Sequence, residues 1–123
     1  MARILVADDA SFMRQMIREI LESEGHEVVA EASDGIQAVE EFKKHHPDLV
    51  TMDIVMPRRS GIDAVRGIVQ LDATARIVMC SALGQETLVN EALQAGASDF
   101  IVKPFKPDAV AATLRRVLEK GNA

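Results

Sequence analysis

Three carboxylates follow short apolar runs of the sequence, at the points where buried strands would end. Asp8 and Asp9 come directly after the run Arg3–Ala7, and Asp53 closes the run Asp48–Asp53. If these strand ends lie side by side, the carboxylates repel one another, which raises the pKa of at least one of them unless a cation is present. A hard divalent ion with oxygen ligands, with Mg²⁺ as the expected ion, would neutralise the group. These acids therefore predict a Mg²⁺ site.

One hydroxyl group and one ammonium group follow two other apolar runs in the same way, at Ser81 and Lys103. A carboxylate beside Mg²⁺ can attack phosphorus and form an aspartyl phosphate. The transferred group then needs positive charge and hydrogen-bond donors around its oxygens. Lys103, the Ser81 hydroxyl and backbone N–H groups of the loops 54–56 and 82–83 would supply them. Asp53 is the predicted nucleophile.

These polar residues share one edge of a sheet only if the apolar runs are parallel strands. Three of the five runs are near-continuous hydrophobics, which is typical of parallel strands covered on both faces. The second run alternates apolar and polar residues and is predicted to be an edge strand. The five runs are Arg3–Ala7, Glu27–Ala32, Asp48–Asp53, Ile77–Cys80 and Asp99–Val102.

The segments between these runs carry apolar residues at the spacing of one helix face. Ser60 and Asp63 are spaced like a capping box at the start of the third helix, and Pro107 suits the first turn of the fifth. The predicted buried faces are Phe12, Met13, Met16, Ile17, Ile20 and Leu21; Ile36, Val39 and Phe42; Ile62, Val65, Ile68 and Val69; Leu88, Ala92 and Ala95; and Val110, Leu114, Val117 and Leu118.

A strand and a helix repeated five times predict the α/β class. We expect a single doubly wound (βα)₅ domain over residues 1–123, with helices on both faces of an open five-stranded parallel sheet. The strand order 2-1-3-4-5 is expected from the common doubly wound pattern, as in flavodoxin-like folds, and not from the residues themselves. In such sheets ligands bind beyond the carboxyl ends of the strands, so the acids, Ser81 and Lys103 should meet there.

The composition narrows the class of protein further. The chain has 123 residues, 48% hydrophobic and 27% charged, which indicates one globular domain. A net charge of −5 without a basic stripe argues against nucleic-acid binding. No apolar run has the length of a membrane span or a signal-peptide core, so a cytoplasmic location is expected. The single cysteine, Cys80, should be a small buried hydrophobe, and zinc is not expected without a His or Cys cluster.

The sequence resembles the response-regulator receiver domains, and among them those of chemotaxis. The resemblance lies in the stretches 4–9, 52–57 with Gly61, 80–82 and 100–105, in the family's order and spacing. It implies a signalling switch rather than an enzyme, in which Asp53 accepts a phosphoryl group from a sensor histidine kinase. By the same resemblance Asp9, Asp53 and the Val55 carbonyl would bind Mg²⁺ directly, and Asp8 through water.

The resemblance also implies a switching role for residues of the last two strands. Ser81 would be the hydroxyl that moves toward the phosphoryl group, and Lys103 the ammonium that binds it. Phe100 would turn inward in concert with Ser81, and the Lys103-Pro104 peptide bond would be cis. Many relatives carry Tyr where this chain has Phe100, which has no hydroxyl to offer a partner. Ser81 replaces the commoner Thr and keeps the donor.

Two apolar residues should set how long the phosphoryl group lasts. Val55 and Leu83 lie two positions after the acceptor and the switch hydroxyl, where family members control the access of water. Neither side chain can orient a water molecule by hydrogen bonding. Slow self-dephosphorylation and dependence on a separate phosphatase are therefore expected.

The expected output is binding of a partner by the face of the fourth helix, fifth strand and fifth helix, near Val89, Leu93, Phe100 and Val102. A flagellar motor switch protein or another effector would be that partner. A phosphorelay intermediate and a receiver excised from a larger regulator remain open. An Mg²⁺-dependent phosphohydrolase with an Asp nucleophile would need a substrate-covering insertion. A flavodoxin-like FMN carrier would need a phosphate loop where this chain has two acids.

Overall fold

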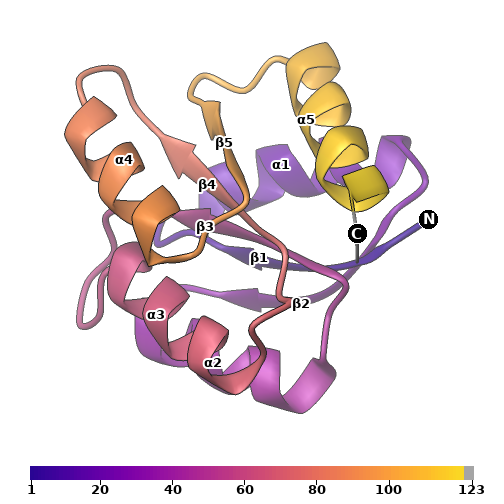
Figure 1. The fold of residues 1–123 in the computed structure, drawn as a ribbon. Coiled ribbons are helices and arrows are strands. Elements are labelled where there is room, and N and C mark those ends of the chain that lie inside the picture. Colours follow the sequence, from indigo (N-terminus) through magenta and orange to yellow (C-terminus); the bar gives the residue numbers. More distant parts are fainter. Residues whose placement is uncertain (121–123) are drawn as a thin grey trace.

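The computed structural model describes residues 1–120 as a parallel sheet flanked by helices (Figure 1). The last three residues of the predicted domain, 121–123, lie outside the described residues. The elements are β1 (Arg3–Ala7), α1 (Ser11–Ser23), β2 (Glu27–Ala32), α2 (Gly35–His45), β3 (Leu49–Asp53), α3 (Gly61–Leu71), β4 (Ile77–Ser81), α4 (Glu86–Ala95), β5 (Asp99–Val102) and α5 (Pro107–Lys120). No helix within residues 1–120 is long and apolar enough to cross a membrane.

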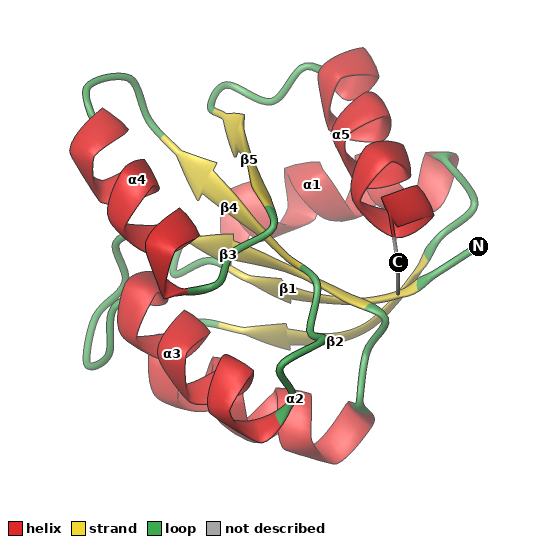
Figure 2. Ribbon diagram, viewed as in Figure 1, coloured by secondary structure: helices red, strands yellow, loops and turns green. Residues whose placement is uncertain are grey.

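The five strands pair in the order β2-β1-β3-β4-β5, and every pair is parallel. The predicted α/β class, the (βα)₅ alternation and the order 2-1-3-4-5 are therefore confirmed (Figure 2). The run Glu27–Ala32 is an edge strand, as its alternating pattern predicts. The strand bounds differ from the predicted runs by one residue in two places, since β3 begins at Leu49 and β4 includes Ser81.

The sheet separates two apolar cores because successive side chains of a strand point to opposite faces. Leu5 of β1 packs into the core with α2, α3 and α4, whereas Ile4 and Val6 pack into the core with α1 and α5. Every residue of β3 and β4 is buried, which explains why these runs are almost continuously apolar. Cys80 lies in the second core, where burial raises the pKa of its thiol well above the ordinary value, as expected of a buried hydrophobe.

The predicted faces of the first two helices extend too far toward their N-termini. Phe12 was predicted to be buried, but it is 70% exposed, and Ile36 is also exposed. Both residues lie in the first turn of a helix, next to the loop that leaves the sheet. Periodicity identifies the side of a helix that faces the core but not the point at which the core ends.

Side-chain caps begin two of the helices. Asp34 Oδ1 accepts a hydrogen bond from the backbone N–H of Gln37 at 2.8 Å, at the start of α2. Ser60 Oγ accepts one from the N–H of Asp63 at 3.2 Å, at the start of α3. The Asp63 carboxylate pairs with Arg66 at 3.0 Å rather than with the backbone of Ser60. The predicted cap of α3 thus forms through Ser60.

Gly61 begins α3 directly against the backbone of β3. Its N–H donates to the Ile54 carbonyl at 2.8 Å, and a β-carbon at this position would overlap the carbonyl oxygen of Asp53.

We expect Gly61→Ala to lower the free energy of unfolding by about 2 kcal/mol or more, because a rotamer change cannot relieve an overlap with backbone. Urea titration measures this. Gly25→Ala, at a positive φ but in open space, should cost about 1 kcal/mol; an equal or smaller loss for Gly61→Ala would contradict the packing argument.

Candidate functional site

Four of the residues singled out from the sequence lie at the carboxyl edge of the sheet. Asp8 follows β1, Asp53 ends β3, Ser81 ends β4 and Lys103 follows β5. The Lys103 ammonium lies 3.0 Å from Asp8 Oδ2 and 3.3 Å from Asp53 Oδ1. One side chain from beyond β5 therefore contacts carboxylates from the ends of β1 and β3.

The carboxylates form a compact group of oxygens. One oxygen of each of Asp8, Asp9 and Asp53 lies within 4.8 Å of the others. Asp8 and Asp53 are buried, and Asp9 is exposed, so the group opens to solvent on one side. The loop that carries the Val55 carbonyl begins directly after Asp53. Oxygen-only donors around a negatively charged opening fit a hard divalent cation such as Mg²⁺.

Asp8 is held in place by contacts that were not foreseen from the sequence. Its Oδ1 accepts a hydrogen bond from the N–H of Ala10 at 2.9 Å, and its backbone N–H donates to the Ala32 carbonyl at 3.0 Å. Arg14 donates from Nη1 to the Asp8 carbonyl at 2.6 Å and from Nε to Glu31 at 2.9 Å. Arg14 thus links β1, β2 and α1 beside the site. A single basic residue in a helix carries no sequence signal for such a role.

The surroundings of Asp53 disfavour the ionised form of its carboxyl group. Burial raises the pKa of Asp53 from 3.8 to about 6, with a further contribution from the Asp8 charge and an opposing one from Lys103. Burial alone would lower the pKa of the Lys103 ammonium, but its hydrogen bond to Asp8 and the charge of Asp53 outweigh this, so the pKa is raised. One ammonium group does not balance the charge of the cluster.

Ser81 and Phe100 border a common groove between α4 and β5. This groove has a volume of about 330 Å³, and Leu93 and Val102 also line it. Ser81 is buried, whereas Phe100 is 39% exposed on the outer side of β5. Val89, predicted near the partner face, is buried in the core under α4 and also lines this groove.

The two residues predicted to control water access lie in the loops that flank Asp53. Val55 is 56% exposed and Leu83 is 83% exposed. The Lys103-Pro104 peptide bond between the site and α5 is cis, as the resemblance implied.

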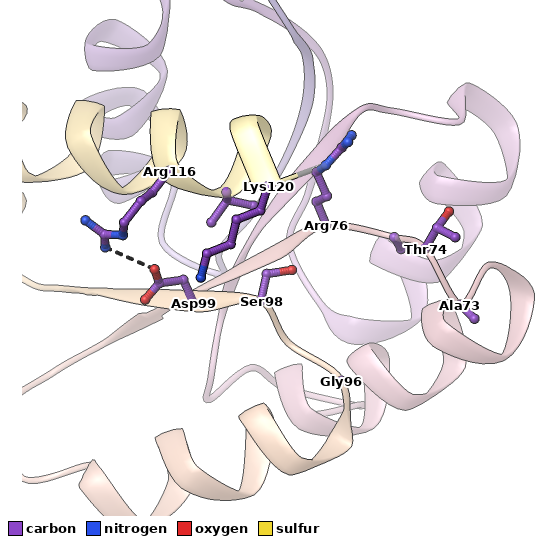
Figure 3. A pocket seen from close by; sticks show the side chains of 10 residues that line it. Ala73, Thr74, Arg76, Gly96, Ser98, Asp99, Arg116 and Lys120 are labelled. Carbon is purple, nitrogen blue, oxygen red and sulfur yellow. Dashed lines mark hydrogen bonds and ion pairs between the residues drawn. The ribbon is translucent and has the colours of Figure 1, made fainter. Parts of the chain in front are cut away.

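A larger pocket, of about 530 Å³, lies at the opposite edge of the sheet (Figure 3). Residues before β4 and β5 and the end of α5 line it, among them Ser98, Arg116 and Lys120. Its carboxylate, Asp99, pairs with Arg116 at 3.0 Å. Asp99 is the one carboxylate among the described residues that line this pocket, whereas three carboxylates gather at the carboxyl edge.

The raised pKa of Asp53 predicts how stability depends on pH. Because the pKa in the folded protein, about 6, exceeds the ordinary 3.8, the stabilisation from protonating Asp53 is complete below about pH 4 and is lost as pH rises through 6. In buffer with a chelator, Asp53→Asn should raise the free energy of unfolding at neutral pH by about 1–3 kcal/mol. Urea titrations from pH 4 to 8 measure this, and the gain should fade toward pH 4.

The matched control is Asp9→Asn, which removes the same charge from the exposed member of the cluster. It should give a smaller gain, because solvent already screens that carboxylate. If the difference in the free energy of unfolding between Asp53→Asn and the native chain does not change with pH, the pKa of Asp53 is not raised in the folded protein.

Comparisons with known proteins agree with this geometry. A family model described as the response regulator receiver domain matches residues 4–115. The chain is 60% identical over 116 residues to the chemotaxis protein CheY of Bacillus subtilis, and this match covers 94% of this chain and 97% of that protein. It is 51% identical over 115 residues to the chemotaxis protein CheY of Thermotoga maritima, and this match covers 94% of this chain and 96% of that protein.

A solved structure shows the same fold. The chain is similar to a protein in the crystal structure of a CheX-CheY-BeF₃-Mg²⁺ complex from Borrelia burgdorferi, with a TM-score of 0.90 and 39% identity. The match covers 94% of this chain and 88% of that one. The predicted resemblance is therefore confirmed by sequence and by structure. This chain belongs to the response regulator receiver domains, a family of signalling switches.

Proposed function

We propose that this chain is a signalling switch in which Asp53 accepts a phosphoryl group from the phosphohistidine of a sensor histidine kinase. The observation that carries the proposal is the Lys103 ammonium placed 3.3 Å from Asp53, within a group of three carboxylates. A cation beside a carboxylate nucleophile can stabilise the charged oxygens of the phosphoryl group that the carboxylate accepts. The chemotaxis relatives support the same role.

The transfer step follows from the groups at the strand ends. An ionised oxygen of Asp53 attacks phosphorus, and a new O–P bond forms. The P–N bond to the donor imidazole breaks, its electron pair stays on the nitrogen, and that nitrogen takes up a proton. Lys103 stabilises the charge on the phosphoryl oxygens, and the Ser81 hydroxyl and the Ala82 N–H donate hydrogen bonds to them.

Asp8, Asp9, Asp53 and the Val55 carbonyl are the proposed holders of Mg²⁺. The three carboxylate oxygens gathered within 4.8 Å fit this ion, since it prefers oxygen donors and the cluster carries more negative charge than Lys103 balances. When bound, Mg²⁺ would neutralise both the cluster and the incoming phosphoryl group. Asp53 would then stay ionised and nucleophilic at neutral pH.

Phosphorylation would alter the groove between α4 and β5. A phosphoryl group adds nearly two negative charges and several acceptor oxygens beside Ser81. As the Ser81 hydroxyl turns toward them, it vacates one end of the groove, and Phe100 can turn inward to fill the space. The face presented by Leu93, Phe100 and Val102 would change shape and bind a flagellar motor switch protein or another effector.

A phosphorelay intermediate or the receiver of a larger regulator would use the same site, and only the partner would differ. In each case the chain would act in the cytoplasm, and a separate phosphatase would end the signal. A phosphohydrolase is disfavoured, because the loops at the carboxyl edge are short. The connections 54–60 and 82–85 cannot fold into a cap over a substrate.

Labelling by a small phosphodonor tests the acceptor. With acetyl phosphate and Mg²⁺, intact-mass analysis should show one added phosphoryl group, which Asp53→Asn and a metal chelator should each abolish. The matched control is Asp48→Asn, which changes an exposed acid directly before β3, at the opposite edge of the sheet, and should be labelled like the native chain. Labelling that persists in Asp53→Asn would overturn the assignment.

The lifetime of the phosphoryl group tests the role of the flanking loops. Because Val55 and Leu83 cannot orient a water molecule, the label should last longer than seconds at room temperature. Leu83→Gln supplies a hydrogen-bonding side chain at that loop and should shorten the lifetime about tenfold. Loss of label after removal of the donor measures this.

Leu71→Gln makes the same replacement at an exposed leucine on α3 and should leave the lifetime unchanged. A native lifetime of seconds or less, or equal lifetimes for the two glutamine variants, would contradict this role of Leu83.

A further inference from the structure

The backbone N–H of Ala82 already has an acceptor in the loop that follows β4. Gln85 Oε1 accepts a hydrogen bond from it at 2.7 Å. Ala82 comes two residues after Cys80, which pairs in register with Asp53. The same N–H is one of the donors that the proposed function assigns to the phosphoryl oxygens. Two acceptors would therefore compete for this one donor.

The contact is unusual for the position that Gln85 occupies. Gln85 is the N-cap residue of α4, yet its side chain accepts no hydrogen bond from the first turn of that helix. A cap side chain ordinarily satisfies an N–H of its own helix. Gln85 instead turns back onto the loop, and the next residue, Glu86, does the same by accepting from the Gly84 N–H at 3.3 Å. Side chains from the start of α4 thus hold the loop 82–84.

We propose that Gln85 is a positioning residue that holds this loop in its unphosphorylated arrangement by occupying the N–H of Ala82. Its amide oxygen takes the place that a phosphoryl oxygen would take. A charged acceptor forms a stronger hydrogen bond than a neutral amide oxygen. Phosphorylation of Asp53 therefore displaces Gln85. The inference rests on the proposed function and adds the residue that opposes the switch.

The release of Gln85 would carry the signal toward the partner face. The loop residue Leu83 and the first helical residue Glu86 both line the groove that Ser81 and Phe100 share. When Gln85 leaves Ala82, that loop and the start of α4 lose one of the two side-chain hydrogen bonds that hold them together. Because coupling between two sites is reciprocal, a partner that favours the released loop would also favour phosphorylation.

Binding of beryllium fluoride, used as a phosphoryl mimic with Mg²⁺, tests the competition. Gln85→Met keeps the length of the side chain and removes the acceptor, so affinity for the mimic should rise about two- to tenfold. Titrations followed by fluorine NMR measure this. The Ala82 amide proton of the free variant should also exchange faster with solvent than in the native chain.

The controls separate a lost acceptor from a general change in α4. Gln94→Met makes the same replacement at an exposed position of this helix and should match the native affinity. Gln85→Glu retains an acceptor oxygen and should bind the mimic no better than the native chain. Mg²⁺ affinity without the mimic should be the same in native and Gln85→Met protein, because Gln85 bonds the loop rather than the carboxylates.

The outcomes distinguish this inference from the function on which it rests. A native chain that neither binds the mimic nor takes up label from acetyl phosphate would overturn the proposed function itself. A native chain that does both, with Gln85→Met equal to it in affinity, would overturn only the role of Gln85. A gain for Gln94→Met as large as that for Gln85→Met would do the same.

Discussion

The contact of the Lys103 ammonium with Asp8 and Asp53 is the constraint on which the rest of the structure depends. β1 and β3 are neighbours, but β4 separates β3 from β5, so Lys103 must reach across the end of β4 to touch both carboxylates. A long flexible side chain can span that distance, and its backbone N–H anchors it by donating to the Ser81 carbonyl at 2.7 Å. The four strand ends are thereby tied together by one residue.

The two loops beside Asp53 are held in different ways, and this would give the proposed switch a direction. The loop after β3 is fixed to α2, because the Gly35 N–H donates to the Arg59 carbonyl at 2.9 Å and Asp34 pairs with Arg58 at 3.4 Å. A β-carbon on Gly35 would overlap that carbonyl, so the backbones are in direct contact. The loop after β4 is held by side chains, which can rotate away without moving the sheet. Under the proposed function, a change at Asp53 would therefore be transmitted toward α4 and β5 more easily than toward α2.

The fold was predictable because its signals are local, whereas the details of the site depend on loops. Near-continuous apolar runs, each followed by a polar residue, place Asp8, Asp53 and Lys103 at one edge once the strands are parallel. The strand order came from a common pattern and could not be read from the residues. Phe12 was misplaced because periodicity does not show where the core ends. Gln85 was missed because a polar residue at the start of a helix is ordinary, and only the loop geometry shows that it faces backward. The roles of the site residues in phosphoryl transfer stay predictions.

The site combines a carboxyl group with a raised pKa, Asp53, and a hydrogen bond to an uncharged amide, Gln85. The two have complementary effects. A pKa of about 6 leaves Asp53 largely ionised at neutral pH, which is the form that the proposed phosphoryl transfer requires, although burial and the Asp8 charge disfavour it. The Gln85 contact, made by an uncharged amide at 2.7 Å, is weaker than the hydrogen bond that a charged phosphoryl oxygen would form. A carboxylate in place of the amide would compete on more equal terms with the phosphoryl group. In the role proposed for Gln85, its neutrality would therefore allow the charge added at Asp53 to decide the position of the loop.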